Sequence, residues 1–325
     1  MEEIQADLTI IGAGPAGLYG AYYAGFRGLS VAIIDSLAEP GGQVAALYPE
    51  KLIFDVAGFP AIKGQDLIER CVEQAAQYDP TYLLNHRAET LEAHEDGSFT
   101  ISTHRGSQVS TKSVIITGGI GTFSPRPLPD GEHFEDKGLV YFVRQLEVMR
   151  DRDVLIVGGG DSAVDWALNL EDVARSITLI HRRDRFRAHE DSVKRLFASS
   201  VDVLVHHEVA HIYGDEDSIT EVEVFDNRDD SRSRLKVSSV IAALGFKSNL
   251  GPLKEWDIEI DGRNIPVDTQ MATNIPGVFA AGDITEYEGK VRLIAVGYGE
   301  AATAVNNAAV YIDPSARVFP GHSSG

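Results

Sequence analysis

The chain has 325 residues, 43% of them hydrophobic, which is enough for two domains that each bury a core. Its formal net charge of -20 argues against binding to nucleic acid or to anionic membrane surfaces, because their phosphates would be repelled. The single cysteine, Cys71, excludes an intrachain disulfide and a redox-active cysteine pair, and it fits the reducing cytoplasm. The histidines are scattered, so no metal site is predicted, and no run resembles a signal peptide or a membrane span.

Hydrophobic patterning predicts alternating strands and helices in the first region. A buried strand over Asp7–Ile11 precedes a helix over Pro15–Gly28, and a second strand covers Ser30–Asp35. Helical spacing then predicts a helix over Gln65–Tyr78. Alternating residues predict further strands near Tyr82–Ala93, Phe99–Thr103 and Gln108–Ser110, followed by an apolar strand over Val114–Thr117 that ends at Gly118-Gly119.

The same order of elements begins again after residue 150. A strand over Val154–Val157, a helix over Asp161–Leu170 and a strand over Ile177–His181 form a second strand–helix–strand unit. The elements predicted after it are strands around Glu208–Ile212, Thr220–Phe225 and Arg234–Val237, a strand over Val240–Leu244 ending at Gly245, a strand over Val278–Ala281 and a helix over Gly297–Tyr311.

The two glycine-ended strands bracket the second unit, so we interpret them as crossings between domains. We predict an α/β fold of two Rossmann-like, three-layer dinucleotide-binding domains, the second inserted into the first. The first comprises residues 1–119 and 245–325, with a C-terminal tail of residues 314–325, and the second comprises residues 120–244. The alternative is one large sheet, but two complete βαβ motifs rarely share a sheet.

The first glycine loop reads Gly12-Ala13-Gly14-Pro15-Ala16-Gly17 and lies between a predicted strand and helix. In this motif the first glycine allows the tight turn, the second allows close approach of a pyrophosphate, and the third allows helix to pack on strand. Asp35 ends the next strand, 18 positions after Gly17, where a carboxylate accepts hydrogen bonds from ribose hydroxyls. A glycine-rich packing turn is the alternative, and it leaves Asp35 unexplained.

Later residues favour a flavin over a nicotinamide at this loop. Gly42 permits close backbone approach, and Gln43 offers an amide to a heteroaromatic edge. The run TNIPGVFAAGD, ending in Gly282-Asp283, resembles the second flavin motif of the flavoprotein reductases that bind two dinucleotides. Considered alone, Asp283 is more simply explained as a helix cap or turn residue.

The second glycine loop predicts NADPH. Its residues are Gly158-Gly159-Gly160-Asp161-Ser162-Ala163, and His181 stands 18 positions after Ala163, where an acid would hold a 2′-hydroxyl. Arg182 and Arg183 follow directly, with Arg187 nearby. Guanidinium groups suit a 2′-phosphate, which NADPH has and NADH lacks. The alternative is a solvated basic surface.

The run GGGDSAVDWALNL followed by ITLIHRRDRFRAHE resembles the NADPH domain of bacterial thioredoxin reductases. Those enzymes carry a Cys-x-x-Cys pair just before this domain's strand, whereas Gly138–Met149 contains no cysteine. Together with EPGGQVAALYPEKLIFDVAGFP and the tail FPGHSS, the chain resembles the thioredoxin-reductase-like ferredoxin–NADP+ reductases. That resemblance implies a homodimer with noncovalently bound FAD in the first domain and NADP(H) in the second.

The resemblance also implies which residues contact the cofactors. Tyr48 would stack on one face of the flavin ring, and His322 from the partner subunit's tail would stack on the other. The positions matched to FAD contacts are Gly12, Gly14, Pro15, Ala16, Gly17, Asp35, Gly42, Gln43, Tyr48, Ala88, Phe123, Gly282, Asp283, His322, Ser323 and Ser324. Those assigned to NADPH are Gly158, Gly160, Asp161, Ser162, Ala163, His181, Arg182, Arg183 and Arg187.

The implied activity is a ferredoxin–NADP+ reductase. A hydride passes from NADPH to FAD, and single electrons then pass to ferredoxin or flavodoxin, with no side chain required as acid or base. One alternative is an NADPH-dependent quinone or disulfide reductase that uses an external dithiol protein. Another is a redox sensor that binds FAD and NADPH without turnover.

Overall fold

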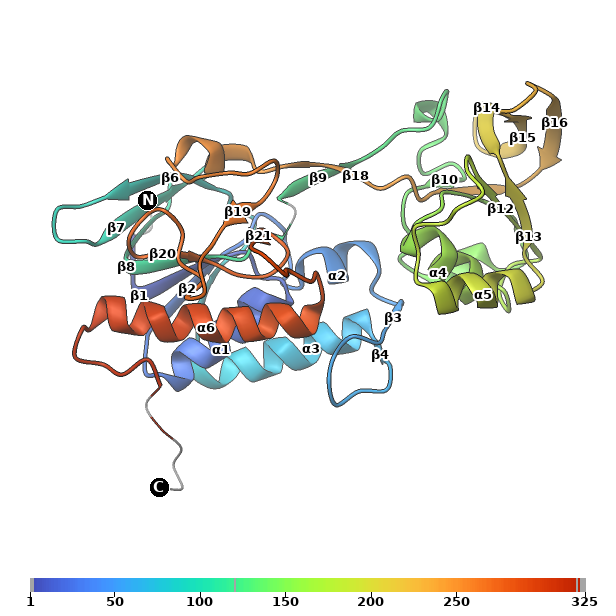
Figure 1. The fold of residues 1–325 in the computed structure, drawn as a ribbon. Coiled ribbons are helices and arrows are strands. Elements are labelled where there is room, and N and C mark those ends of the chain that lie inside the picture. Colours follow the sequence, from blue (N-terminus) through green and yellow to red (C-terminus); the bar gives the residue numbers. More distant parts are fainter. Residues whose placement is uncertain (1–2, 120, 320, 322–325) are drawn as a thin grey trace. The chain divides into compact units, whose positions relative to one another are not determined.

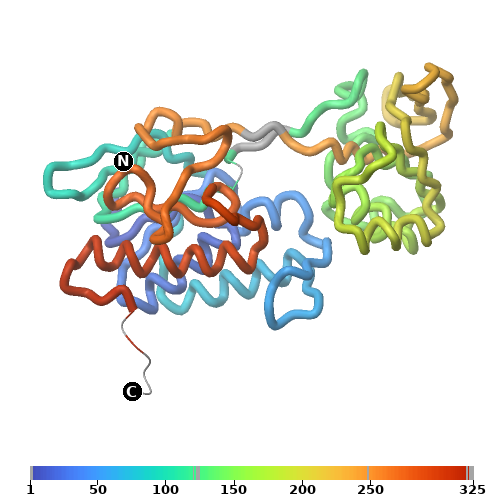
Figure 2. Tube along the Cα trace, viewed as in Figure 1, coloured from blue at the N-terminus to red at the C-terminus, as the bar shows by residue number. Residues whose placement is uncertain are grey.

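The computed structural model describes residues 3–119, 121–319 and 321, with no side-chain description for 122–124, 247 and 248. The chain divides into two compact units, the first comprising residues 1–123 and 248–325 and the second residues 124–247. The connecting segments β9 (Thr122–Pro125) and β18 (Phe246–Asn249) pair with each other. Figures 1 and 2 show the chain leaving the first unit and returning to it once. The predicted α/β fold with two Rossmann-like domains is confirmed.

The first unit is built on a largely parallel sheet of order β5-β2-β1-β8-β7-β6, with β20 paired to β8. Its strands are β1 (Glu3–Ile11), β2 (Val31–Ile34), β5 (Thr81–Leu83), β6 (Ala88–Ala93), β7 (Phe99–Thr103), β8 (Gln108–Ile116) and β20 (Val278–Ala280). At the carboxyl end of β1, Ile11 pairs with Ile34 of β2 and with Ile116 of β8. The carboxyl ends of three parallel strands therefore meet at one edge, which is where open α/β sheets bind ligands.

Helices α1 (Pro15–Phe26), α3 (Gly64–Ala75) and α6 (Ile294–Ile312) pack on one face of this sheet (Figure 1). Figure 2 shows α1 and α6, from opposite ends of the sequence, side by side. The contact is close because both helices present small residues: a Cβ placed on Gly20 would lie 3.7 Å from Ala301 Cβ. Leu8, Ile10 and Ile33 of the sheet are fully buried against this helical layer.

The opposite face of the sheet packs against the chain from residue 250 to 265, while β6 and β7 extend the sheet at one edge. Ile34, Ile116 and Phe99 are buried there together with Leu253 and Trp256. The indole of Trp256 donates a 2.9 Å hydrogen bond to the Glu89 carbonyl, so its polar group stays paired inside the core. The unit thus has three layers: the helices, the sheet and the segment that packs on the sheet's other face.

The second unit contains a five-stranded parallel sheet of order β10-β17-β11-β12-β13 and an antiparallel meander, β14-β15-β16. Its elements are β10 (Leu139–Val140), β11 (Asp153–Val157), α4 (Asp161–Asn169), β12 (Ser176–His181), α5 (Glu190–Ala198), β13 (Asp202–Val205), β14 (His207–Gly214), β15 (Ile219–Asp226), β16 (Arg232–Lys236) and β17 (Ser239–Ala242). Leu155, Val157 and Ile180 of the sheet share a core with Val222 and Val224 of the meander.

Several predicted elements differ from the observed ones. The strands expected at Gln108–Ser110 and Val114–Thr117 are one strand, β8, because β1 pairs with it along its whole length. The strand expected near Tyr82–Ala93 is divided into β5 and β6 by a turn at Asn85, whose φ is 56°. Sequence patterning did not predict α2 (Gly42–Leu47), α5 or β13.

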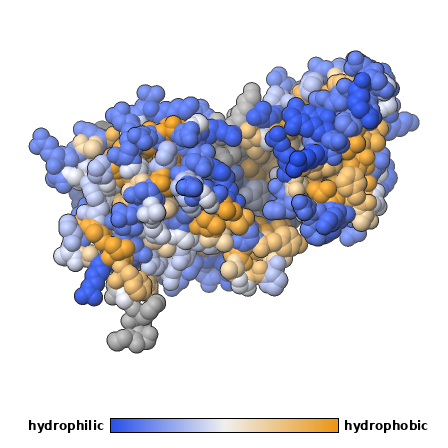
Figure 3. All heavy atoms as spheres, in the orientation of Figure 1, coloured by the Kyte–Doolittle hydropathy of each residue, from blue (hydrophilic) through white to orange (hydrophobic). Residues whose placement is uncertain are grey.

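The remaining elements are short strands and single helical turns. They are β3 (Leu52–Ile53), β4 (Ile62–Lys63), β19 (Ile265–Pro266), β21 (Thr285–Glu286) and the 3₁₀ turns η1 (Ala76–Tyr78), η2 (Glu132–Phe134), η3 (Leu146–Met149) and η4 (Gly251–Glu255). On the face drawn in Figure 3, hydrophilic residues cover much of the surface and apolar residues form smaller patches between them. Among helices within the described ranges, none has the length and apolar character to cross a membrane.

Candidate functional site

The first unit contains a cavity of about 400 Å³, a size typical of small-molecule sites. It opens at the edge where β1, β2 and β8 end, because Ile11, Ile34 and Thr117 all line it. Most of the positions predicted to contact FAD also line it: Gly12, Gly14, Pro15, Ala16, Asp35, Gly42, Gln43, Tyr48, Ala88, Gly282 and Asp283. The fold therefore brings these predicted positions, from five separate stretches of sequence, to one pocket.

The three glycines of the first loop meet different surroundings. A Cβ on Gly12 would lie 2.7 Å from the Thr117 carbonyl oxygen, and one on Gly17 would lie 1.9 Å from the Gly12 carbonyl oxygen. Gly12 also has φ +111, which side chains rarely tolerate. A Cβ on Gly14 would meet no described protein atom within 4 Å. Gly12 and Gly17 are therefore required by the protein's own packing, whereas the space beside Gly14 is open to a ligand.

Asp35 is almost fully buried and holds the glycine loop to the end of β2. Its Oδ2 accepts a 2.6 Å hydrogen bond from the Ala13 amide, and its Oδ1 accepts one of 2.8 Å from the Leu37 amide. Burial raises the pKa of this carboxyl, although the two amide hydrogen bonds oppose the shift. Each oxygen retains a second lone pair, so Asp35 can still accept a ribose hydroxyl at the cavity wall.

The helix α2 carries Gln43, and Tyr48 directly follows its last residue as the C-cap, so both lie at the cavity. Its start is fixed to the first loop because the Gly41 amide donates a 2.7 Å hydrogen bond to the Ala13 carbonyl. Burial, together with the nearby charges of Asp283 and Asp55, raises the pKa of Tyr48 to about 12. Tyr48 is therefore a neutral phenol at physiological pH and presents an uncharged ring to the cavity.

Asp283 follows β20 and lines the cavity on another side. Its side chain is accessible through the cavity, yet loss of surrounding water raises its pKa, an effect that Lys290 and Arg292 partly offset. Among the residues that the structure describes, none donates a hydrogen bond to its carboxylate, while Asn264 binds its backbone carbonyl at 2.9 Å. An acceptor at a cavity wall without a protein donor suits a ligand hydroxyl.

The second glycine loop repeats the geometry of the first in the other unit. The Gly158 amide donates to the Ile180 carbonyl at 3.0 Å, as the Gly12 amide does to Ile34 at 2.8 Å. A Cβ on Gly158 would lie 2.4 Å from the Ala243 carbonyl oxygen, whereas one on Gly160 would meet no described atom within 4 Å. Ala163 is fully buried at the packing position, and Asp161 and Ser162 begin α4.

The predicted basic residues lie beside this loop. Residues Arg182, Arg183 and Arg187 are exposed, and their guanidinium groups make no hydrogen bond or ion pair within the described part of the chain. The Arg187 amide donates to the Gly159 carbonyl at 2.7 Å, so this arginine is held directly at the glycine turn. Three unpaired guanidinium groups beside an open glycine turn suit a phosphate ligand.

His181 covers the middle of the second loop, where a Cβ on Gly159 would lie 2.3 Å from its ring. Its Nε2 is 3.2 Å from the Arg185 carbonyl oxygen and donates to it. Burial and the neighbouring arginines lower the pKa of His181, although the Arg185 hydrogen bond opposes the shift. The imidazole is therefore neutral at physiological pH, so His181 shapes the loop while the arginines supply the charge.

Two further contacts, which sequence patterning did not predict, anchor the arginine segment, which we define as residues 182–189. Asn227, in the turn after β15, donates from Nδ2 to the Arg182 carbonyl at 2.9 Å and to Glu208 Oε1 at 3.0 Å. The Oδ1 of Asp161 accepts a 2.9 Å hydrogen bond from the His189 amide. Asp161 therefore holds the far end of the arginine segment, in addition to any ligand contact.

Not every predicted position lies at a cavity. Gly17 does not line it and serves packing instead, because its neighbour Gly12 occupies the space a side chain would need. The side chain of Phe123, and the whole of His322, Ser323 and Ser324, lie outside the described residues. Lining residues that were missed include His86, Arg87 and Leu250–Leu253, which carry no motif and reach the cavity only through the fold.

The residues present fit the two cofactors that the motifs predict. Each unit has a strand–glycine loop–helix arrangement in which one glycine of the motif, Gly14 or Gly160, faces open space. Each unit also adds charged groups suited to one dinucleotide. Within the described ranges, no three histidine, cysteine or acidic side chains are grouped as a metal site would require.

Comparison with known proteins agrees with this geometry. The family model of the pyridine nucleotide-disulphide oxidoreductases matches residues 6–308. The ferredoxin–NADP reductase of Frankia alni is 59% identical over 318 residues, covering 98% of both chains, and that of Salinispora arenicola is 59% identical over 324 residues, covering 100% of this chain and 99% of its own. Among solved structures, the thioredoxin reductase of T. acidophilum has a TM-score of 0.84 at 26% identity, covering 96% of this chain and 99% of its own. That of Lactococcus lactis has a TM-score of 0.83 at 27% identity, covering 94% and 99%.

Proposed function

The chain belongs to the pyridine nucleotide-disulphide oxidoreductase family and, within it, to the ferredoxin–NADP reductases, and on this premise we propose that it is an FAD-dependent oxidoreductase acting between NADPH and ferredoxin or flavodoxin. One observation separates this activity from disulfide reduction: the chain has a single cysteine. Cys71 is buried, its sulfur is 3.3 Å from the Tyr298 hydroxyl, and burial raises the pKa of its thiol. A thiol of this kind does not exchange with disulfides readily.

Bound FAD would supply the exchange between a two-electron donor and a one-electron acceptor. In the first unit, the amides at the start of α1 and the open space beside Gly14 support a pyrophosphate, while Asp35 and Asp283 offer acceptors to ribose and ribityl hydroxyls. Tyr48 offers a neutral ring for stacking. In the second unit, Arg182, Arg183 and Arg187 bind the 2′-phosphate of NADPH.

The test compares four acceptors side by side: ferredoxin, flavodoxin, thioredoxin and a quinone, each with NADPH and with NADH. We expect the fastest turnover with NADPH and one of the two small electron carriers. Faster reduction of thioredoxin or of the quinone would favour a disulfide or quinone reductase instead. Rapid mixing with NADPH also separates an enzyme from a redox sensor, because a sensor would bind NADPH without losing its flavin absorbance.

Asn227 is expected to contribute to the choice of NADPH. Asn227→Ala removes the hydrogen bond that holds the Arg182 carbonyl, so we expect the KM for NADPH to rise roughly two- to fivefold, in line with the net value of about 0.5–1 kcal/mol for one hydrogen bond. The KM for NADH in the same variant serves as the internal control and should stay unchanged. An equal rise for both nucleotides would mean that Asn227 supports the fold rather than the arginine segment.

We also propose a cytoplasmic homodimer in which the tail of one subunit reaches the partner's cavity. Arg27, just after α1, donates to the carbonyls of Arg317 at 2.9 Å and Val318 at 3.1 Å, which ties the tail to the end of α1 far from the cavity. Because the 12 residues of α1 span about 18 Å, the described part of the tail lies well away from the cavity at the start of that helix, which supports a tail that serves the partner subunit.

Replacing His322 tests this arrangement. His322→Ala is expected to alter the absorption bands of the bound flavin, because a ring stacked on the isoalloxazine is lost. For the unaltered protein, light scattering during size-exclusion chromatography should give twice the chain mass of 35.3 kDa. A monomeric mass, or identical flavin spectra for His322→Ala and the unaltered protein, would argue against a tail supplied by the partner subunit.

A further inference from the structure

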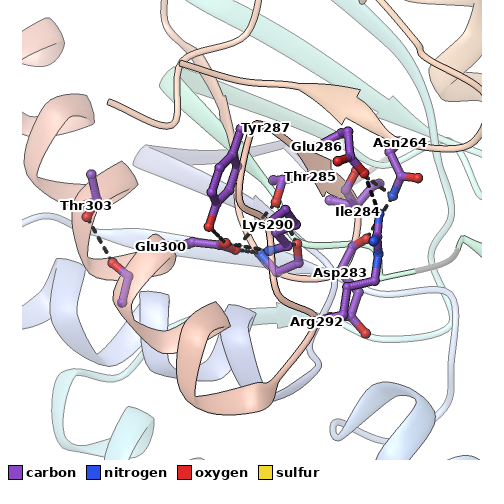
Figure 4. A network of polar contacts seen from close by, with 12 residues as sticks. Asn264, Asp283, Ile284, Thr285, Glu286, Tyr287, Lys290, Arg292, Glu300 and Thr303 are labelled. Atoms are coloured by element: carbon purple, nitrogen blue, oxygen red, sulfur yellow. Dashed lines mark hydrogen bonds and ion pairs between the residues drawn. The ribbon is translucent and has the colours of Figure 1, made fainter. Parts of the chain in front are cut away.

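A buried ion pair lies next to the turn that carries Asp283 (Figure 4). Lys290 comes from the segment between β21 and α6, and Glu300 comes from α6 itself. Their side chains are only 2% and 4% exposed. Because burying two charges is costly, such a pair is weak evidence for a role in stability, and this makes a role in orienting neighbouring groups the hypothesis to test.

Both members of the pair bind the backbone of one residue, Gly282. Glu300 Oε2 accepts a 2.7 Å hydrogen bond from the Gly282 amide, and Lys290 Nζ donates to the Gly282 carbonyl at 3.0 Å. Thr285 adds two donors to that carbonyl, its hydroxyl at 2.8 Å and its amide at 3.1 Å. The amide and the carbonyl of Gly282 are thus both held by charged side chains.

The pair is itself fully supported. Lys290 also donates to Glu300 Oε1, and its ammonium lies 5.4 Å from the centre of the Tyr287 ring. The Tyr287 hydroxyl donates to the same carboxylate at 2.6 Å (Figure 4). The pair therefore has little freedom to rearrange, and the group it binds has little freedom to move.

Gly282 is a tight point in the wall of the cavity. Its φ of +84 is one that side chains rarely adopt, and a Cβ on it would lie 3.3 Å from Ala16 Cβ at the start of α1. A Cβ on Gly297 of α6 would lie 3.5 Å from the Gly282 Cα. Gly282 thus packs between the first glycine loop and α6, and the next residue is Asp283.

We infer that Lys290 and Glu300 are positioning residues that hold the Gly282–Asp283 turn in the geometry required to bind FAD. The inference rests on the proposed FAD site. The pair fixes the amide and carbonyl of Gly282, Gly282 fixes where Asp283 meets the cavity, and the distance from Asp283 to the first glycine loop is set as a result. Neither Lys290 nor Glu300 lines the cavity, so they act through Gly282 and not on the cofactor.

The test replaces the pair by apolar residues of similar size, in Lys290→Met with Glu300→Leu. Such replacements are often neutral for stability when they pack well, although here the Gly282 amide and the Tyr287 hydroxyl lose their acceptor, so the Tm of the variant is measured first to verify that it is folded. The measured quantity is the rate at which diluted holoenzyme releases FAD, followed by the rise in flavin fluorescence. We expect release at least tenfold faster than from the unaltered protein. Release within twofold of the unaltered rate would overturn the inference.

Two matched variants separate positioning from general stability. Val305→Ala removes buried volume from the same helix without touching the turn, and it should release FAD at close to the unaltered rate even where its Tm falls. Lys290→Met with Glu300→Gln keeps an acceptor for the Gly282 amide, and it should recover part of the retention. Positioning through Gly282 would be contradicted if FAD were released at the same rate from the variants with Glu300→Leu and Glu300→Gln. It would also be contradicted if Val305→Ala released FAD as fast as the apolar double variant.

A milder variant keeps the test valid if the apolar double does not fold. Thr285→Val removes one donor from the Gly282 carbonyl and leaves the ion pair in place, so FAD release should be two- to fivefold faster; an unchanged rate would count against the inference. Failure of the proposed function would look different, since the unaltered protein itself would then bind no FAD.

Discussion

Replacing Gly14 with valine is expected to give a folded protein that has lost most of its affinity for FAD. The backbone at Gly14 is extended, with φ -71 and ψ -179, which valine adopts readily, and no described atom lies within 4 Å of the new Cβ. The added methyl groups would occupy the space proposed for the pyrophosphate. Overpacking a close-fitting site costs about 1–3 kcal/mol, or roughly 5- to 150-fold in affinity.

The second glycine loop supplies the matched control. Gly160 has the same extended backbone, with φ -99 and ψ -179, and the same open space beside it. Gly160→Val should therefore keep the yellow colour of bound flavin while weakening NADPH binding to a similar degree. Gly14→Val purifying with a full complement of FAD would refute the assignment of the first loop, and so would loss of flavin from Gly160→Val.

Removing two arginines beside the second loop is expected to change the choice of nucleotide. In the double variant Arg182→Ala with Arg183→Ala, we expect the KM for NADPH to rise at least tenfold, because two charge-assisted contacts to the 2′-phosphate are lost at about 1.5–3 kcal/mol each. The KM for NADH should hardly change, since NADH has no phosphate at that position. Steady-state kinetics with both nucleotides measures the two values.

Arg195 provides the control for charge alone. It is an exposed arginine of α5 in the same unit, so Arg195→Ala removes positive charge without touching the segment beside Gly159. The KM values of Arg195→Ala for NADPH and for NADH should stay within about twofold of those of the unaltered protein, because exposed charges act weakly through water. A double variant that weakens both nucleotides equally would remove the assignment of Arg182 and Arg183 to the 2′-phosphate.

Short-range patterns were sufficient wherever a constraint is local in the chain. A glycine that must turn tightly lies beside the strand that precedes it, so Gly12 and Gly158 are recognisable from the spacing of a few residues. Asp35 and the arginines after His181 follow the second strand of their βαβ units, β2 and β12. Their spacing from the glycine loop in the sequence is therefore set by the length of one βαβ unit. For the same reason the carboxyl ends of β1 and β11 were predicted at Ile11 and Val157, where they are observed, although β1 begins four residues earlier than predicted.

Long-range contacts decided the rest. The single strand β8 exists because β1 pairs with all of it, and alternation followed by an apolar run concealed that continuity. His86 and Leu250–Leu253 reach the cavity because separate segments pack on one sheet, and Asn227 reaches Arg182 across 45 positions of sequence. The burial of Lys290 and Glu300 is likewise invisible in a sequence where charged residues usually signify surface. Burial of a residue depends on which distant segments pack around it, and only the tertiary structure determines those segments.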